Sequence, residues 1–179
     1  MAREEISEIY CWKIESLRLT IYMASSKIGA VNIGLCLGKG HDCQEYFKKI
    51  FPQHIVKKDK AINRPLIEAI ETALDGKILS KDLKLDIHPT PFQRMVLEEI
   101  ALIPYGQTRA YGEVAMIVGR PGGARAVGQI MKRNPLPIIF PCHRVVAARG
   151  LGGFSGGLAL KRYLLDRESS SKRKKIKNP

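Results

Sequence analysis

A stretch of nine residues, 138–146, constrains this chain most, because it sets a cysteine and a histidine between two apolar runs. The first run is Ile-Ile-Phe at 138–140, the second is Val-Val at 145–146, and Pro-Cys-His-Arg at 141–144 separates them. Short apolar runs beside a proline indicate strand or buried core. The residues between the runs are then expected to form a turn at the end of a rigid segment. A reactive side chain there is held by packing, yet it reaches the rim of a pocket.

Length and composition indicate one domain, or two small ones, with a sizeable core. The chain has 179 residues, of which 45% are hydrophobic. No apolar run approaches the roughly 20 residues that cross a bilayer, and the N-terminus carries acidic residues, which a signal peptide lacks. We therefore expect a cytoplasmic protein, or a nuclear one in a eukaryote, with no membrane partner. Its four cysteines are expected to be free thiols.

The net charge of +13 is concentrated in the second half of the chain. Residues 1–88 hold 14 Lys/Arg and 12 Asp/Glu, whereas residues 89–179 hold 16 and 5, so the halves carry +2 and +11. A basic half beside a nearly neutral half indicates a polyanionic partner, most simply nucleic acid. Solubility alone is the competing explanation of this charge.

The N-terminal part of the chain is expected to form a small α/β domain over residues 1–80. Residues 17–22 and 33–37 alternate apolar and polar side chains on either side of a polar turn, which predicts an antiparallel hairpin. Pro65 fits the first turn of a helix, and Gly76 fits its end. The prediction is a small antiparallel sheet with helices, and it contains no recognisable chemical site.

After a linker over residues 81–89, residues 90–168 are expected to form a mainly α-helical domain. The Thr-Pro-Phe-Gln sequence at 90–93 provides a helix cap and a capping box. Two short helices, 111–118 and 124–133, then flank a Pro-Gly-Gly turn, and the second helix is basic. This pattern is typical of a helix-turn-helix. A helical hairpin that only fills the core is the alternative.

The second of these helices combines small side chains with basic and polar ones. Ala124, Ala126 and Gly128 leave little bulk, whereas Arg125 and Gln129 are expected to be exposed. A helix of this kind brings its backbone close to another surface. Close packing against a neighbouring helix explains the small residues equally well.

The last segments are a loop, a helix and a tail. Residues 150–157 hold five glycines, which favours a loop that wraps closely round a ligand. No Lys-Ser or Lys-Thr follows it, so a phosphate-binding loop of the nucleotide hydrolases is not expected. A helix is expected over residues 158–167. The Ser/Lys-rich residues 169–179 are expected to be a disordered basic tail.

Cys142 is the candidate nucleophile and His143 its candidate base. A free thiol titrates near about 8.5, so its thiolate needs a base or a cation nearby. Neighbours on an extended segment point opposite ways, so a bridging water or a bend at Pro141 is needed to connect the two side chains. The histidine in turn needs an orienting carboxylate. Spacing does not choose among the carboxylates of this domain: Glu98, Glu99, Glu113, Asp166 and Glu168.

No metal or other cofactor is expected. A structural zinc site is the weaker alternative, because its candidate ligands do not follow a standard spacing. Those candidates are Cys11, Cys36, His41, Cys43 and His88.

Taken together, the motifs of residues 90–168 resemble those of the O6-alkylguanine-DNA alkyltransferases, the suicide DNA-repair proteins. The resemblance runs in order, with few gaps, through the segments 90–93, 103–106, 111–115, 124–128, 134–137, 141–145 and 154–157 and Lys161. Residues 1–80 resemble the family only in size and in their hairpin-plus-helix pattern. The resemblance implies a methylated-DNA–protein-cysteine methyltransferase that acts once.

The resemblance also implies catalytic roles. Cys142 is implied to accept the alkyl group from O6-alkylguanine in a direct displacement. His143 is implied to act as the base through a water, and Glu168 to orient it. Tyr111 is implied to donate a proton to the leaving guanine.

Binding roles follow from the same resemblance. The helix containing Ala124, Ala126, Gly128 and Gln129 is implied to enter the minor groove of double-stranded DNA. Arg125 is implied to fill the gap left by a flipped nucleotide, and Asn134 to brace the hinge behind the helix. The implied pocket residues are Met131, Pro137, Val145, Phe154, Ser155 and Lys161, and the family predicts a monomer.

Two other functions compete with this one. A helix-turn-helix protein that senses damaged DNA without chemistry would share the basic helix, but non-catalytic relatives replace the cysteine that this chain keeps. A Cys-His hydrolase would use Cys142 and His143, but it would leave the basic helix without a role.

Overall fold

The computed structural model describes residues 8–78, 80 and 82–177, with side chains described as far as residue 170. It divides into two compact units. The first holds residues up to Thr72 together with Ile78–Ile87, and the second holds Ala73–Lys77 together with residues from His88 onward. No helix of the described part is long and apolar enough to cross a membrane.

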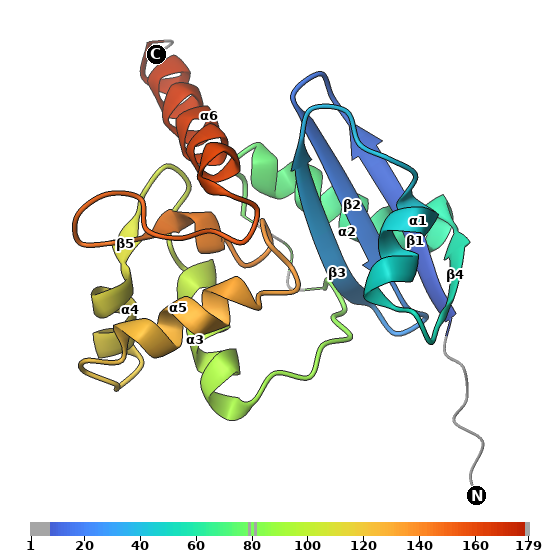
Figure 1. Cartoon of the computed structure of the whole chain (residues 1–179). Helices are drawn as coiled ribbons and strands as arrows, with labels where there is room; N and C mark the ends of the chain where they lie inside the picture. Colours follow the sequence, from blue (N-terminus) through green and yellow to red (C-terminus); the bar gives the residue numbers. More distant parts are fainter. Residues whose placement is uncertain (1–7, 79, 81, 178–179) are drawn as a thin grey trace, which may run out of the picture. The chain divides into compact units, whose positions relative to one another are not determined.

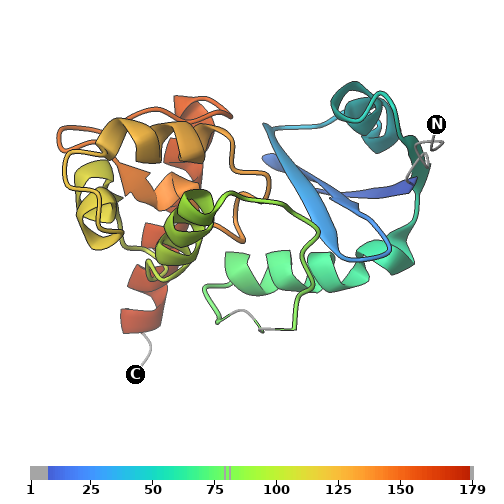
Figure 2. The same cartoon turned by 90° about the horizontal axis from the view of Figure 1, so that it is seen from below.

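The first unit is a four-stranded sheet with a helix on each face (Figures 1 and 2). Its elements are β1 (Glu8–Glu15), β2 (Leu19–Ser25), β3 (Ala30–Leu37), α1 (Cys43–Ile50), β4 (Ile55–Lys58) and α2 (Lys60–Leu74). The strand order is β3-β2-β1-β4. Figure 2 shows α1 and α2 on opposite sides of the sheet, and every residue of the central strand β2 is buried.

The predicted hairpin is confirmed, but the predicted antiparallel sheet is incomplete. β2 pairs antiparallel with both β3 and β1, whereas β4 pairs parallel with β1, so the sheet is mixed. β4 escaped the sequence analysis because it is four residues long and only Val56 in it is buried. An edge strand so short and charged carries almost no apolar alternation.

The predicted start of a helix at Pro65 was wrong. α2 begins at Lys60, so Pro65 lies inside the helix, because Asp59 accepts a hydrogen bond from the Ile62 amide at 2.9 Å and starts the helix a turn early. Of the predicted linker 81–89, the described residues up to Ile87 belong to the first unit, and those from His88 onward belong to the second. Lys84 accepts the Ala30 amide at 2.9 Å, which ties that segment to β3.

The second unit is mainly helical, as predicted. Its elements are α3 (Pro91–Ala101), β5 (Arg109–Ala110), α4 (Tyr111–Ile117), α5 (Ala124–Lys132), the 3₁₀ turn η1 (Cys142–Arg144), β6 (Val145–Val146) and α6 (Leu158–Lys177). The capping box at the start of α3 is confirmed, since Thr90 and Gln93 bond each other's backbone amides. Gly119 and Gly122, both with positive φ, form the turn between α4 and α5.

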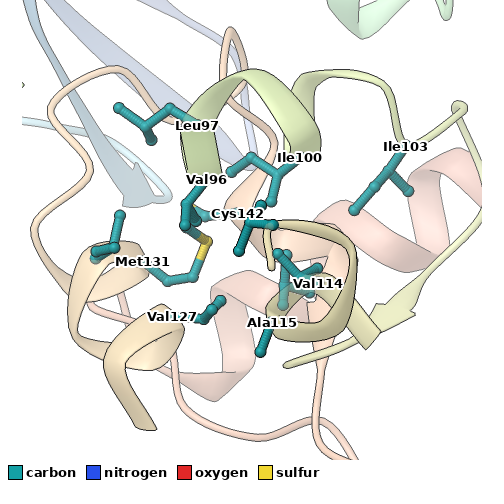
Figure 3. Close-up of a cluster of buried hydrophobic side chains, with 12 residues drawn as sticks. Val96, Leu97, Ile100, Ile103, Val114, Ala115, Val127, Met131 and Cys142 are labelled. Carbon is teal, nitrogen blue, oxygen red and sulfur yellow. The ribbon is translucent and has the colours of Figure 1, made fainter. Parts of the chain in front are cut away.

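The core of this unit lies between α3, α4 and α5 (Figure 3). Val96 and Ile100 of α3, Val114 of α4 and Val127 of α5 are fully buried there. Cys142 belongs to the same cluster. The helix-turn-helix therefore forms one wall of the site that contains the cysteine.

The segment before Cys142 is a turn with Ile138 and Ile139 buried, so of the two predicted alternatives, strand or buried core, the structure shows buried core. Residues 137–139 turn, Ile138 has a φ of 78°, and Cys142 begins η1. A proline on either side, at 137 and 141, removes the amides that a strand ladder needs. Cys142 and His143 therefore lie on a helical turn, not on an extended segment.

The helix α6 extends further than predicted. It was expected to end at residue 167 and to be followed by a disordered tail, yet the helical backbone continues to Lys177. No proline or glycine interrupts residues 158–177, and basic residues near a helix C-terminus complement its dipole. The last two residues of the predicted tail lie outside the described residues.

Candidate functional site

Cys142 is buried at the start of η1, where Asn134 holds the incoming backbone. The Asn134 side-chain amide donates to the Phe140 carbonyl at 2.8 Å, and its oxygen accepts the Leu136 amide at 3.0 Å. The Cys142 amide donates to the same Phe140 carbonyl at 2.7 Å. One asparagine after α5 thus shapes the turn that presents the thiol.

Cys142 lies at a cavity of about 540 Å³. The cavity is lined from α4, α5, η1 and the glycine-rich loop, by Tyr111, Ala124, Arg125, Gly128, Met131, Lys132, Cys142, Gly153, Phe154 and Ser155. This volume lies within the roughly 300–1,000 Å³ typical of small-molecule sites. Eight of these ten residues are predicted from the sequence, in segments as far apart as 111 and 155, and the fold brings them together.

Other predicted residues do not line this cavity. Pro137 is only half-buried and lies in the turn before η1, while Val145 and Lys161 are fully buried. Ala126 and Gln129 lie on α5 outside the lining, with Gln129 exposed. These residues support the cavity or face away from it. Lys132 also lines the cavity, although no role was predicted for it.

The thiol of Cys142 is neutral at rest. Burial raises its pKa above the ordinary value, although the Asn134 side chain and the charge of Lys161 act in the opposite direction. A neutral thiol is a weak nucleophile, so a nearby base must take its proton during reaction.

His143 is neutral and oriented by Glu168. Its Nε2 lies 2.7 Å from Glu168 Oε1, and burial lowers the pKa of His143 despite that hydrogen bond. An ionised carboxylate only accepts, so Nε2 carries the proton and donates it to Glu168. Nδ1 is then the basic nitrogen. It is buried and has no hydrogen-bond partner among the described residues.

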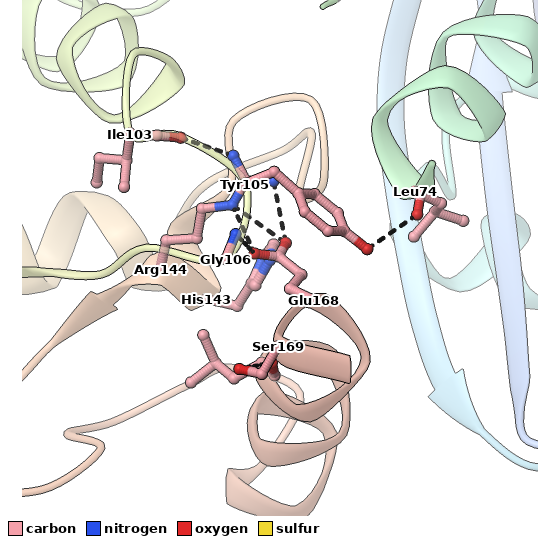
Figure 4. A network of polar contacts seen from close by, with 9 residues as sticks. Leu74, Ile103, Tyr105, Gly106, His143, Arg144, Glu168 and Ser169 are labelled. Carbon is pink, nitrogen blue, oxygen red and sulfur yellow. Dashed lines mark hydrogen bonds and ion pairs between the residues drawn. The ribbon is translucent and has the colours of Figure 1, made fainter. Parts of the chain in front are cut away.

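Glu168 is held by a dense set of donors (Figure 4). Arg144 donates to it from Nε at 3.1 Å and from Nη2 at 3.0 Å, and the Gly106 amide donates at 2.8 Å. Burial alone would raise the pKa of Glu168, but hydrogen bonds from His143 and Arg144 hold it below the ordinary value. The carboxylate of α6 is therefore ionised and fixed in place.

Arg144 is a site residue that the sequence analysis gave no role. It is 8% exposed, and its Nη1 donates to the Ile103 carbonyl at 2.7 Å. Its guanidinium lies 5.5 Å from the centre of the Tyr105 ring. Its place beside His143 in the Pro-Cys-His-Arg motif was the only available signal.

A second polar cluster includes two residues of the cavity lining, Tyr111 and Gly153. The Tyr111 hydroxyl donates to the Gly153 carbonyl at 3.1 Å, and Lys161 Nζ donates to the same carbonyl at 3.2 Å. Gly152 has a φ of 69°, and a β-carbon there would lie 2.8 Å from the Tyr111 ring. The glycine-rich loop thus packs closely on Tyr111, which needs glycine at this position.

The cysteines of the first unit lie apart from this chemistry. Cys11 and Cys43 are buried with their sulfurs 3.3 Å apart, and burial raises the pKa of Cys11 to about 12. Among the described residues, no three His, Cys, Asp or Glu side chains gather closely enough to hold a metal ion. The structure therefore does not assemble the zinc ligands considered from the sequence.

Comparison with known proteins identifies the family. Residues 91–170 match the family described as "6-O-methylguanine DNA methyltransferase, DNA binding domain". The crystal structure of the Mycobacterium tuberculosis O6-methylguanine methyltransferase is 32% identical to this chain and superposes with a TM-score of 0.71. That superposition covers 91% of this chain and 94% of the other. The chain belongs to the O6-methylguanine DNA methyltransferase family.

A second crystal structure and one further relative extend the comparison. The M. tuberculosis protein in complex with DNA is also 32% identical, covers 92% of this chain and 94% of its own, and superposes with a TM-score of 0.70. A Methylated-DNA–protein-cysteine methyltransferase of Mycobacterium bovis is 45% identical over 105 residues, which are 58% of this chain. In sequence, the chain spans 64% of the length of that relative. The structural match extends over both the sheet-containing unit and the helical unit, in agreement with the predicted α/β part followed by a mainly α-helical part.

Proposed function

We propose that this protein repairs DNA by moving an alkyl group from O6-alkylguanine onto Cys142, once per molecule. The observation that carries the proposal is a buried thiol at a 540 Å³ cavity, next to a histidine whose free nitrogen is basic. The names of the relatives, and the DNA in one relative's crystal structure, support the same reaction.

In the proposed reaction, His143 Nδ1 takes the thiol proton of Cys142 through a bridging water. The thiolate attacks the alkyl carbon, the carbon–oxygen bond breaks, and its electron pair stays with the purine. Tyr111 then donates its hydroxyl proton to a ring nitrogen of the leaving guanine. The sulfur keeps the carbon as a thioether, which has no ready route back, so the protein is consumed.

The partner in this proposal is double-stranded DNA, bound by a monomer through α5. Ala124 and Gly128 leave little side-chain bulk where α5 lines the cavity, and Arg125 on the same helix is exposed. Such a helix fits a minor groove, and neutralised phosphates make the affinity salt-dependent. Flipping the damaged nucleotide costs a few kcal/mol, and less where the lesion pairs poorly.

Labelled O6-benzylguanine tests the proposal directly. The protein is incubated with the base labelled on its benzyl group, digested, and read by mass spectrometry at the Cys142 peptide. One benzyl group per protein, stable to dilution, is the expected result. An unmodified Cys142 would favour binding without chemistry, and repeated turnover of an ester or amide would favour a hydrolase.

Replacing Arg125 with alanine is expected to slow repair of duplex DNA by about tenfold or more. The rate of reaction with the free base is expected to stay within about twofold, because an arginine in the minor groove assists only when a nucleotide is flipped out of a duplex. Single-turnover rates on both substrates measure this. Lys49→Ala, which removes one exposed charge from α1, is the control. Equal losses on both substrates would exclude the proposed role of Arg125.

A further inference from the structure

Lys161 is the most unusual buried group that the proposed reaction leaves without a role. It lies on α6 and is fully buried, and no carboxylate of the described part of the chain pairs with it. Burial lowers its pKa to about 8. Its Nζ donates to the Val145 carbonyl at 2.6 Å and to the Gly153 carbonyl at 3.2 Å. Burying a charged amine is unfavourable unless hydrogen bonds compensate for its lost hydration, and these two carbonyls provide them.

The Gly153 carbonyl is shared between two donors. The Tyr111 hydroxyl donates to it at 3.1 Å, and Lys161 Nζ donates to it at 3.2 Å. The same ammonium lies 5.6 Å from the centre of the Tyr111 ring. A phenol has one proton to donate. Tyr111 therefore cannot donate to Gly153 and to a leaving purine at the same time.

We propose that Lys161 is a positioning residue that keeps the Gly153 carbonyl hydrogen-bonded when Tyr111 turns its hydroxyl to the leaving purine. This inference rests on the proposed function and assigns Lys161 a part in it. When the phenol turns away, Lys161 Nζ is the remaining donor among the described residues that holds this exposed carbonyl of the pocket wall in place. With Lys161 present, the carbonyl keeps a donor throughout. The Val145 carbonyl anchors the ammonium on the cysteine side of the pocket.

The inference predicts that Lys161 acts through Tyr111. A double-mutant cycle measures this by the single-turnover rate of benzyl transfer from O6-benzylguanine. Tyr111→Phe is expected to lower the rate by about 100-fold, within the usual range for a positioned proton donor. Lys161→Met, which keeps the length of the side chain, is expected to lower it by about 30-fold, as loss of a hydrogen bond at a charged group does.

The double variant decides the case. If Lys161 acts through Tyr111, the double variant is expected to react about as slowly as Tyr111→Phe alone, because the phenol that Lys161 assists is already absent. If the two losses multiply to about 3,000-fold, the residues act independently and the inference is wrong.

A better leaving group provides a second readout. O6-Benzylguanine with bromine at C8 releases a more stable purine anion, which needs less help from Tyr111. The loss caused by Lys161→Met is then expected to shrink to about threefold or less, as it does for any group that assists departure. An equal loss on both bases would mean that Lys161 only supports the fold, and would overturn the inference.

Lys161→Gln covers the case in which the methionine variant does not fold. Its amide keeps N–H donors but carries no charge, so the same cycle with Tyr111→Phe is expected to show the same non-additivity with a smaller single loss. The unmodified protein separates the two proposals. If it fails to take a benzyl group, the proposed function fails. If it reacts while the cycle is additive, the function stands and only the role of Lys161 is refuted.

Discussion

Replacing Cys142 with alanine is expected to abolish alkyl transfer completely, because the thiol that accepts the alkyl group is gone. Binding to duplex DNA is expected to change by less than about threefold, because the thiol is buried at the cavity and binding arises from phosphate contacts elsewhere. No other group of the described cavity lining is a strong nucleophile; Ser155 is a hydroxyl without a base. Transfer is measured by mass spectrometry after incubation with O6-benzylguanine. Binding is measured by fluorescence anisotropy at two salt concentrations.

The chain offers its own control for this substitution. Cys36 is a half-buried thiol of β3 in the first unit, so Cys36→Ala removes a cysteine without touching the cavity. It is expected to leave both transfer and binding unchanged. Residual transfer by Cys142→Ala, or full loss of binding with it, would show that the cavity is not where the chemistry happens.

Much of the cavity could be predicted from sequence because its parts are local motifs. Three of these motifs can each be recognised from a short stretch of sequence. They are the Pro-Cys-His-Arg turn, the two helices around glycines with positive φ, and the glycine-rich loop. Local backbone preferences for proline and glycine are the strongest signals a single sequence carries.

The remaining features depend on contacts between distant segments. Five carboxylates competed as partner of His143, and only the packing of α6 against η1 puts Glu168, rather than Glu98 or Asp166, within hydrogen-bond distance. The same packing buries Arg144 and Lys161, whose charges suggested exposure. Spacing along the chain contains no information about such contacts.

The sequence left strand and buried core open for the run 138–140, and the structure decides between them. The run is as apolar as a strand, yet it turns, because Asn134 accepts and donates hydrogen bonds around it and prolines flank it. Apolar content alone does not separate a buried turn from a buried strand. The distinction matters for chemistry, since a 3₁₀ turn sets the relative directions of Cys142 and His143.

Changing Glu168 to glutamine is expected to slow transfer by about 100-fold or more and to destabilise the fold by about 3–5 kcal/mol. Transfer slows because the carboxylate holds the proton on Nε2 and leaves Nδ1 basic; an amide oriented the other way would reverse the tautomer. Stability falls because Arg144, at 8% exposure, would lose the charge that compensates its own. Single-turnover kinetics and urea unfolding measure the two effects.

The pH dependence of that stability loss identifies its cause. The pKa of Glu168 is depressed in the folded state, so its stabilisation is fully present above its ordinary value of 4.5 and is lost as the pH falls through the lower folded value. The difference in unfolding free energy between the native protein and Glu168→Gln should therefore be constant from pH 6 to about 5 and shrink below it. Asp166→Asn, an exposed carboxylate on the same helix, should show almost no difference at any pH. A Glu168 difference that persists unchanged in acid would mean that shape, not charge, holds this network together.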